Sequence, residues 1–358
     1  MSTFLTIIEF VLFFGLLIFF HELGHFLSSK ALGIEVEEFG LGYPPRMVKL
    51  FTWKGTDVTL NWIPFGGFTR PKGEGDETVP GGMAAAPVWK RFLVLFSGPM
   101  MNFIVGIVVL VVLFAGVGAP ATDKVLITDI SPNSPAAIAN LQTGDVITAI
   151  NGTKLTSLQD LSTIIQANLG KEINLTVDRN GEILTIKLTP RVNPPEGEGS
   201  VGIWYTNPYE PQPFTQSVGY AFQAFGSQAQ QTLLLPYNLI TGKIAGKDAR
   251  LVGVVGIYNI FSNASELDAT SSVATATPLP VYRLSVISTV SIALGLTNLL
   301  PIPALDGGQI LFLLPEILFK KRVPQKVANT INSVFFLLLV ILMFYITFQD
   351  IVNPITLP

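Results

Sequence analysis

The chain has 358 residues, of which 49% are hydrophobic and 13% are charged, with a formal net charge of -3 and a mean hydropathy of +0.51. This composition favours a membrane protein, and the charge gives no indication of nucleic-acid binding. The chain contains no cysteine, which excludes disulfide bonds and thiolate-ligated metal sites.

The first apolar run begins at Phe4. Residues 4–20 are apolar except for Thr6, Glu9 and Gly15, and with the next seven residues they reach the length that spans a bilayer. The first twenty residues contain no Lys or Arg, whereas a secretory signal normally carries a positive amino-terminal region. We therefore expect a retained span.

The end of this run carries an H-E-x-x-H motif. His21 and His25 are four residues apart on one helix face, so both can direct an imidazole nitrogen to one zinc ion, with Glu22 placed to act on a water molecule there. They are the only two histidines, so the third protein ligand of such a zinc site must be a carboxylate. Two histidines satisfying ordinary hydrogen bonds are the alternative. Ionisable groups at membrane depth are costly, which favours a functional site.

The segment 33–90 is rich in glycine and proline. Within it, residues 57–70 begin with alternating apolar and polar side chains and break at Pro64 and at Gly66-Gly67, which predicts a short β-hairpin. An ordinary solvent loop fits the pattern as well. A loop that dips into the membrane interface is favoured by aromatic residues, namely Trp53, Trp62, Phe65 and Phe68.

A second uncharged run, 92–117, is long enough to cross a membrane. Its first turns hold Gly98-Pro99 and Asn102. Polar groups commonly bridge helices in lipid, so we expect Asn102 to hydrogen-bond to a neighbouring helix or to the active site.

Residues 119–192 have a different character. β-type runs are separated by the turn pairs Asn151-Gly152 and Asn180-Gly181, and two helical stretches lie between them. The expected strands are 125–130, 145–150, 173–177 and 183–188, and the expected helices are 135–140 and 157–167.

The segment 193–280 is less informative. Residues 214–235 predict an amphipathic helix at the membrane surface. Residues 251–257 fit either a buried strand or a re-entrant piece.

A third span is expected at 284–300 and a fourth at 327–349. After the third, the stretch Asn298-Leu-Leu-Pro-Ile-Pro-Ala-Leu-Asp306 is broken by two prolines and followed by two glycines. Asp306 has an apolar neighbourhood in which an unpaired carboxylate would be costly, and a bound cation would remove that cost. The alternative is a simple Asp-Gly turn that ends a helix.

The loop before the last span predicts the orientation of the chain. It carries one acid, Glu316, against four basic residues, and by the positive-inside rule it is cytoplasmic. Four spans then place segment 33–90 inside and residues 119–192 outside. His21, His25 and Asp306 all fall at the inner ends of their spans, at similar depth. The basic residues are Lys320, Lys321, Arg322 and Lys326.

These motifs together resemble the site-2 protease family of intramembrane zinc metalloproteases, in the bacterial form with one inserted PDZ domain. The resemblance runs from Phe4 to Gly308. Its carriers are H-E-L-G-H, the hairpin, Gly98-Pro99 with Asn102, the N-x-x-P-x-P-x-L-D-G stretch, and the PDZ-like segments 134–137, 141–147 and 150–152.

The resemblance implies that His21, His25 and Asp306 bind zinc and that Glu22 is the catalytic acid and base. It also implies that Asn298 helps to hold the substrate or the oxyanion, and that the re-entrant hairpin pairs with the unwound substrate helix. We expect this pairing along a hairpin edge at residues 57–65. We further expect substrate contacts at Thr59, Asn61 and Asn102.

The expected fold is an α-helical polytopic membrane protein with about four transmembrane helices, a membrane re-entrant β-hairpin and an inserted extracytoplasmic α+β PDZ domain. The expected parts are a first membrane half (1–118), the PDZ domain (119–192), a linker with a surface helix (193–280) and a second membrane half (281–358).

The expected activity is zinc-dependent hydrolysis of peptide bonds within or near the transmembrane helices of single-span proteins, such as anti-sigma factors or remnant signal peptides. The expected location is a bacterial inner membrane, with the active site toward the cytoplasm. The PDZ groove is expected to accept a peptide by strand addition or to act as a plain spacer.

Two alternatives come from other classes. One is a non-catalytic PDZ scaffold with a structural zinc site, against which Glu22 argues because a structural site needs no base. The other is a zinc transporter or sensor, which would require more polar residues along the spans.

Overall fold

The computed structural model describes residues 3–195, 197–243, 251–270 and 279–354. The chain divides into two compact units. One contains residues 1–116 and 218–358, and the other contains residues 117–217. We call the first the helical unit and the second the sheet unit.

Within the described residues, three helices of the helical unit are long and apolar enough to cross a membrane: α1 (Thr3–Ala31), α2 (Val88–Val117) and α11 (Gln325–Val352). Little of each apolar stretch is buried inside the protein. Side chains such as Leu12, Val108 and Phe344 are instead exposed, an arrangement that suits contact with lipid.

A further helix, α8 (Val281–Asn298), was expected as a span but does not reach the same length and apolarity among the described helices. The reason is its polar face, which packs against α2. Fully buried Ser288 and Ser291 donate hydrogen bonds to the main-chain oxygens of Gly106 and Asn102, at 3.2 and 2.8 Å. Small and polar residues allow such close contact between helices in a membrane. The structure therefore gives three candidate spans, and the fourth remains a prediction.

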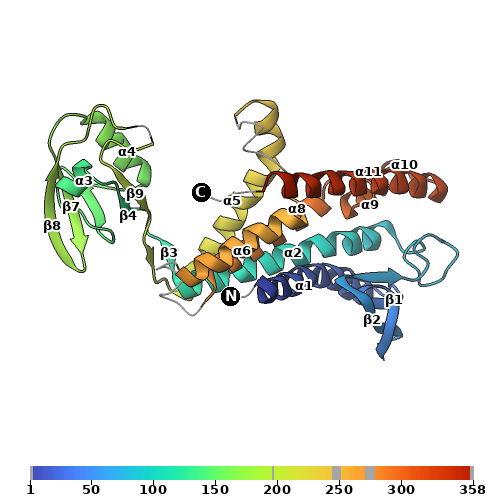
Figure 1. Cartoon of the computed structure of the whole chain (residues 1–358). Coiled ribbons are helices and arrows are strands. Elements are labelled where there is room, and N and C mark those ends of the chain that lie inside the picture. Colours follow the sequence, from blue (N-terminus) through green and yellow to red (C-terminus); the bar gives the residue numbers. More distant parts are fainter. Residues whose placement is uncertain (1–2, 196, 244–250, 271–278, 355–358) are drawn as a thin grey trace. The chain divides into compact units, whose positions relative to one another are not determined.

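Helix α6 (Val254–Thr270) runs beside α1 and α8 (Figure 1). Phe10 and Phe13 of α1 pack against Phe261 of α6. At the amino end of α6, the main-chain N–H groups of Gly253 and Gly256 donate to the buried carboxylate of Asp350 in α11, each at 2.9 Å. The segment 251–257 is thus the start of a helix capped by an anion, and the expectation of a strand there was wrong.

Three other helices among the described residues belong wholly or largely to this unit. Helix α5 spans Phe214–Ile240 and confirms a long helix after residue 213. After α8, the short helices α9 (Asp306–Leu311) and α10 (Leu314–Phe319) precede α11.

The strands β1 (Val36–Trp53) and β2 (Thr56–Pro71) form a hairpin whose turn lies at Lys54-Gly55, where both residues have positive φ. The predicted break at Pro64 and Gly66-Gly67 is not the turn. β2 continues through it, because its end returns to pair with the start of β1.

This return places residues 57–60 inside the sheet. They pair with residues 38–41 on one side and with residues 49–52 on the other, whereas residues 67–70 pair with 38–41. Residues 57–60, where we expected a free edge, are therefore paired on both sides. Among the described strands, residues 67–71 form an outer edge.

The side chains of Thr59 and Asn61 also form hydrogen bonds inside the hairpin. Thr59 Oγ1 donates to Glu38 Oε1 at 2.9 Å, and Asn61 Nδ2 donates to the main-chain oxygen of Gly42 at 3.1 Å. Both side chains are buried. This disfavours the direct substrate contacts expected of them, because both side chains are buried and the Thr59 hydroxyl and the Asn61 Nδ2 already have partners.

The sheet unit contains a six-stranded sheet in the order β8-β7-β5-β4-β9, with β6 paired to β5. The helices predicted near 135 and 157 are confirmed, and so are the four predicted strands. The strand β9 lies beyond the expected boundary at residue 192 and pairs with β4, so the unit continues to residue 217. Its elements are β4 (Val125–Ile130), α3 (Pro135–Ile138), β5 (Val146–Ile150), β6 (Thr153–Lys154), α4 (Leu158–Ala167), β7 (Ile173–Arg179), β8 (Glu182–Leu188) and β9 (Ile203–Thr206), with a separate pair β3 (Ala119–Pro120) and β10 (Tyr209–Glu210).

Candidate metal centre

Three side chains that are far apart in sequence converge on one point. Nε2 of His21 lies 3.2 Å from Nε2 of His25 and 3.1 Å from Oδ2 of Asp306. Nε2 of His25 lies 3.5 Å from Oδ1 of Asp306. Among the described residues, these three form a cluster whose ligand atoms lie within 4.8 Å of one another.

These spacings suit a zinc ion. Ligand atoms at the corners of a tetrahedron with bonds of about 2.0–2.1 Å lie about 3.3 Å apart. The three separations fall on both sides of that value, so the donor atoms can bind one ion with only small shifts. Two imidazoles and one carboxylate leave a fourth position open, as catalytic zinc sites do.

The histidines lie one turn apart on α1, where α2 approaches closely. A Cβ at Gly98 would lie 2.2 Å from Nε2 of His25, and one at Gly24 would lie 2.3 Å from the main-chain oxygen of Ser97. Only the absence of these side chains lets the two helices meet at the site. The other ring nitrogens then contact α2: Nδ1 of His25 is 2.8 Å from the Val94 carbonyl, and Nδ1 of His21 is 3.1 Å from the Asn102 amide.

Asp306 reaches the histidines because the chain turns back after α8. A Cβ at Gly307 would lie 2.3 Å from the carbonyl oxygens of Leu299 and Leu300, so this turn requires glycine. Ala304 adopts a φ of 77°, and its N–H donates to Oδ1 of Asn332 in α11 at 3.1 Å. The broken segment thereby presents Asp306 at the first turn of α9.

Glu22 is held by the outer edge of β2. The main-chain N–H of Thr69 donates to Glu22 Oε2 at 2.9 Å, and Thr69 Oγ1 donates to the main-chain oxygen of Glu22, also at 2.9 Å. The carboxylate is thus oriented by a strand rather than by its own helix. It lies beside the metal cluster, since Glu22 lines two cavities together with His25 and Asp306.

Residues 9–342 match the model of Peptidase family M50. The chain belongs to this family. A Clostridium perfringens protein that bears a zinc metalloprotease name is 32% identical over 96% of this chain and 98% of its own length. The Bacillus subtilis regulator of sigma-W protease RasP is 28% identical over 97% of this chain and 98% of its own length.

These findings make the chain an M50 zinc metalloprotease and an integral membrane protein. A solved PDZ domain of an SdrC-like protein from Listeria innocua is also similar. It is 22% identical, matches 24% of this chain and 96% of its own length, and has a TM-score of 0.22.

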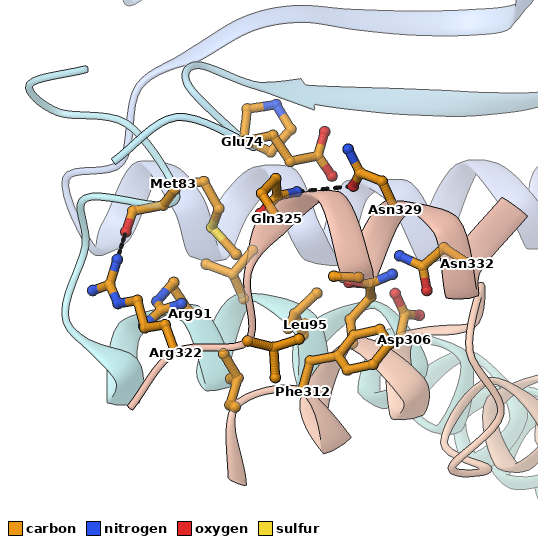
Figure 2. Close-up of a pocket in the computed structure, with 18 of the residues that line it drawn as sticks. Glu74, Met83, Arg91, Leu95, Asp306, Phe312, Arg322, Gln325, Asn329 and Asn332 are labelled. Atoms are coloured by element: carbon orange, nitrogen blue, oxygen red, sulfur yellow. Dashed lines mark hydrogen bonds between the residues drawn. The ribbon is translucent and has the colours of Figure 1, made fainter. Parts of the chain in front are cut away.

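The larger of the two cavities of this M50 peptidase has a volume of about 620 Å³. Figure 2 shows Glu74, Asn329, Asn332 and Asp306 around the same space. Gln325 and Asn329 belong to the first turns of α11 and hydrogen-bond to each other at 2.9 Å. Polar side chains thus line the approach to the candidate metal ligands, which suits access of water to a site between apolar helices.

An ion-pair network borders the same cavity. The carboxylate of Glu316 contacts Arg91 of α2 and lies 3.0 Å from Nε of Arg322. Arg322 also lies 2.8 Å from Glu77 and donates to the main-chain oxygen of Ala84 at 2.9 Å. These contacts hold the segment after β2 against the linker before α11 (Figure 2).

The smaller cavity has a volume of about 290 Å³ and is lined by both histidines, Glu22 and Asp306. Asn298, at the end of α8, also lines it. The structure therefore brings four expected residues and Asn298 together. Asn102 instead lies at the back of His21 with no exposed surface, and does not line either cavity.

Sequence reasoning missed several residues that shape the centre. The Val94 carbonyl and the Thr69 N–H are main-chain groups, which no side-chain pattern reveals. Asn332 lies in the predicted fourth span. Its amide forms a polar stripe at helical spacing with the amides of Gln325 and Asn329. That stripe was the available signal.

Proposed function

We propose that this M50 zinc metalloprotease cleaves peptide bonds within or near the transmembrane helix of single-span membrane proteins, with its active site toward the cytoplasm. The observation that carries the proposal is the metal cluster itself. Its ligands come from the apolar helix α1 and from the broken segment after α8, and Glu22 lies beside them. A catalytic centre at this position can act on a chain that lies in the membrane.

The residues divide the chemistry among them. Zinc, when bound, polarises the peptide carbonyl and lowers the pKa of a water molecule. Glu22 accepts a proton from the attacking water and returns it to the leaving amine. Asn298 lines the smaller cavity beside Glu22 and Asp306, where its amide can donate to the developing oxyanion or hold the substrate main chain.

The outer edge of β2 is the best place for the substrate to bind. A helix must open before cleavage, since its carbonyls are engaged in hydrogen bonds within the helix. Residues 67–71 form an outer edge of the β1–β2 sheet, and Thr69 in this edge contacts Glu22. A peptide added to this edge as a further strand would lie beside the catalytic carboxylate.

The orientation follows from charge. Lys320, Lys321, Arg322 and Lys326 lie together before α11, and short cytoplasmic loops carry such an excess of basic residues. With α8 as a fourth span, the protein lies in a bacterial inner membrane and its sheet unit lies outside the cytoplasm.

We also propose that the sheet unit is a PDZ domain whose strand β9 accepts peptide by strand addition, with a passive size filter as the alternative.

The substrates that fit best are anti-sigma factors and remnant signal peptides, because both present a single membrane span. The name of the Bacillus subtilis relative, a regulator of sigma-W protease, supports the first class. Both classes require a site that accepts an extended segment from within the bilayer.

The test is cleavage of a model single-span peptide by the purified chain in lipid vesicles. Glu22→Gln keeps the shape of the side chain and an oxygen for the Thr69 N–H, but cannot take up a proton. We expect it to abolish cleavage while bound zinc stays nearly constant. Glu37→Gln, at an exposed acid of β1, is the matched control and should cleave normally. Full activity of Glu22→Gln would refute the proposal.

A further inference from the structure

Two residues of α2 contact the two histidines at the ring nitrogens that point away from Asp306. The carbonyl of Val94 lies 2.8 Å from Nδ1 of His25, and the side-chain amide of Asn102 lies 3.1 Å from Nδ1 of His21. The two α2 residues are eight positions apart and so share one helix face, opposite histidines that are four positions apart. One helix thus supplies a hydrogen-bond partner to each ligand.

The partner of Nδ1 decides which form of a neutral imidazole is present. Such a ring has one N–H and one lone pair, and a zinc ligand must offer the lone pair. A carbonyl can only accept, so Val94 places the proton of His25 on Nδ1. The lone pair of His25 is then on Nε2, which faces Asp306.

The Asn102 amide can either donate a hydrogen bond to Nδ1 of His21 or accept one from it. Its Nδ2 is the atom near His21, and its buried Oδ1 has no hydrogen-bond partner among the described residues. With Nδ2 donating, the proton of His21 lies on Nε2 and can be donated to Asp306 Oδ2 at 3.1 Å. That form offers no lone pair to a cation. A half-turn of the amide exchanges its nitrogen and oxygen within nearly the same volume.

We propose that Asn102 is a positioning residue of the zinc site, not a substrate contact. When its amide turns, Oδ1 accepts the Nδ1–H of His21, and the lone pair of Nε2 faces the metal. The proton of the neutral ring moves from Nε2 to Nδ1, and the charge of the ring is unchanged. This proposal rests on the metal centre and is independent of the substrate and of the membrane orientation.

The surroundings of Asn102 suit this role. Its side chain is fully buried, and its main-chain oxygen accepts a hydrogen bond from the fully buried Ser291 at 2.8 Å. The amide can therefore rotate while its backbone stays fixed. Because Ser291 belongs to α8, the helix that leads to Asp306 also holds the partner of His21.

The test is zinc affinity of the full-length chain in detergent, measured by competition with a chelator. Asn102→Leu removes the acceptor and should weaken binding by about 10- to 100-fold. Asn102→Asp keeps an oxygen that can only accept, so its affinity should equal or exceed that of the parent chain. Equal losses in the two variants, or no loss in Asn102→Leu, would overturn the proposal.

Ser288→Ala is the matched control. It removes a buried hydrogen bond from α8 to α2, Ser288 to Gly106, one turn away from Asn102 and without contact to a histidine. Its zinc affinity should not change. An equal loss in this control would show that general helix packing, and not the His21 partner, sets the affinity.

A second measurement needs no variant. With only two histidines in the chain, selective ¹⁵N labelling gives signals from just two imidazoles, provided that the purification tag contains no histidine. In the zinc-loaded chain we expect both rings to carry their proton on Nδ1. A His21 ring without a proton on Nδ1 would overturn the proposal whatever the variants do.

Discussion

The main-chain N–H of Thr69 donates to the carboxylate of Glu22 at 2.9 Å, although the two residues lie on different elements and 47 positions apart. This contact joins the outer edge of β2 to α1, the helix that carries the proposed catalytic carboxylate. The Thr69 N–H is engaged by Glu22, so a peptide that pairs with the neighbouring residues of this edge would lie beside the Glu22 carboxylate. The sheet that is proposed to receive substrate therefore also orients the carboxylate that we propose as the catalytic base.

The hydroxyl of Thr69 provides the first prediction. Thr69→Val keeps the β-branched shape and the main-chain N–H but removes the hydrogen bond from Oγ1 to the Glu22 main chain. Such a bond contributes about 1 kcal/mol, so we expect kcat to fall by about fivefold with little change in KM. Steady-state cleavage of a model peptide measures this. Thr52→Val, at an exposed threonine of β1, is the control, and an equal fall in both would argue against a specific role.

The second prediction concerns removal of the proposed carboxylate ligand, Asp306. Asp306→Ala leaves two imidazoles, and zinc affinity should fall by more than about 100-fold, because loss of a direct ligand costs more than loss of its hydrogen-bond partner. Metal analysis after dialysis measures it. Asp76→Ala, in the exposed segment after β2, should retain full zinc content. An unchanged stoichiometry in Asp306→Ala would remove this residue from the ligand set.

The third prediction concerns the close packing of α1 and α2. Gly98→Ala places a methyl group 2.2 Å from Nε2 of His25, so the ring must move or the helices must separate. We expect loss of bound zinc and of cleavage. Gly226→Ala in α5 is the control, because a Cβ there meets nothing within 4 Å, and alanine favours a helix by about 1 kcal/mol. Normal zinc binding by Gly98→Ala would contradict the geometry of the site.

The fourth prediction concerns acid sensitivity of the sheet unit. Burial raises the pKa of the Asp145 carboxyl, but hydrogen bonds from Arg179 and from the Gln142 N–H outweigh it, and the pKa is lowered overall. A lowered folded-state pKa gives stability that is fully present above the unfolded value, about 3.9, and is lost as the pH falls below it. Hydrogen exchange of β5 and β7, corrected for intrinsic rates, should therefore accelerate between pH 5 and pH 3. Asp145→Asn should exchange faster at pH 6 and depend less on pH in this range.

Local patterns in the sequence were enough for much of this protein. The H-E-x-x-H spacing places two histidines on one face of any helix, and the absence of other histidines and of cysteine requires a carboxylate as the third ligand. Alternating side chains and Asn-Gly turns gave the strands of the sheet unit near 125, 146, 173 and 182. These features depend on the side-chain periodicity of each helix or strand, which the local sequence determines.

The tertiary structure decided what depends on main-chain groups and on contacts between distant elements. The return of β2 to residues 38–41 left an outer edge at 67–71, and residues 57–60 of the expected edge are paired on both sides, because strand order in a sheet is not encoded in the alternation of one strand. The carbonyl of Val94 and the N–H of Thr69 are present in almost any residue, so only their positions give them a role. Asn102 is a similar case. In the sequence it is one polar residue in an apolar run, and only the crossing of α1 and α2 places its amide next to His21.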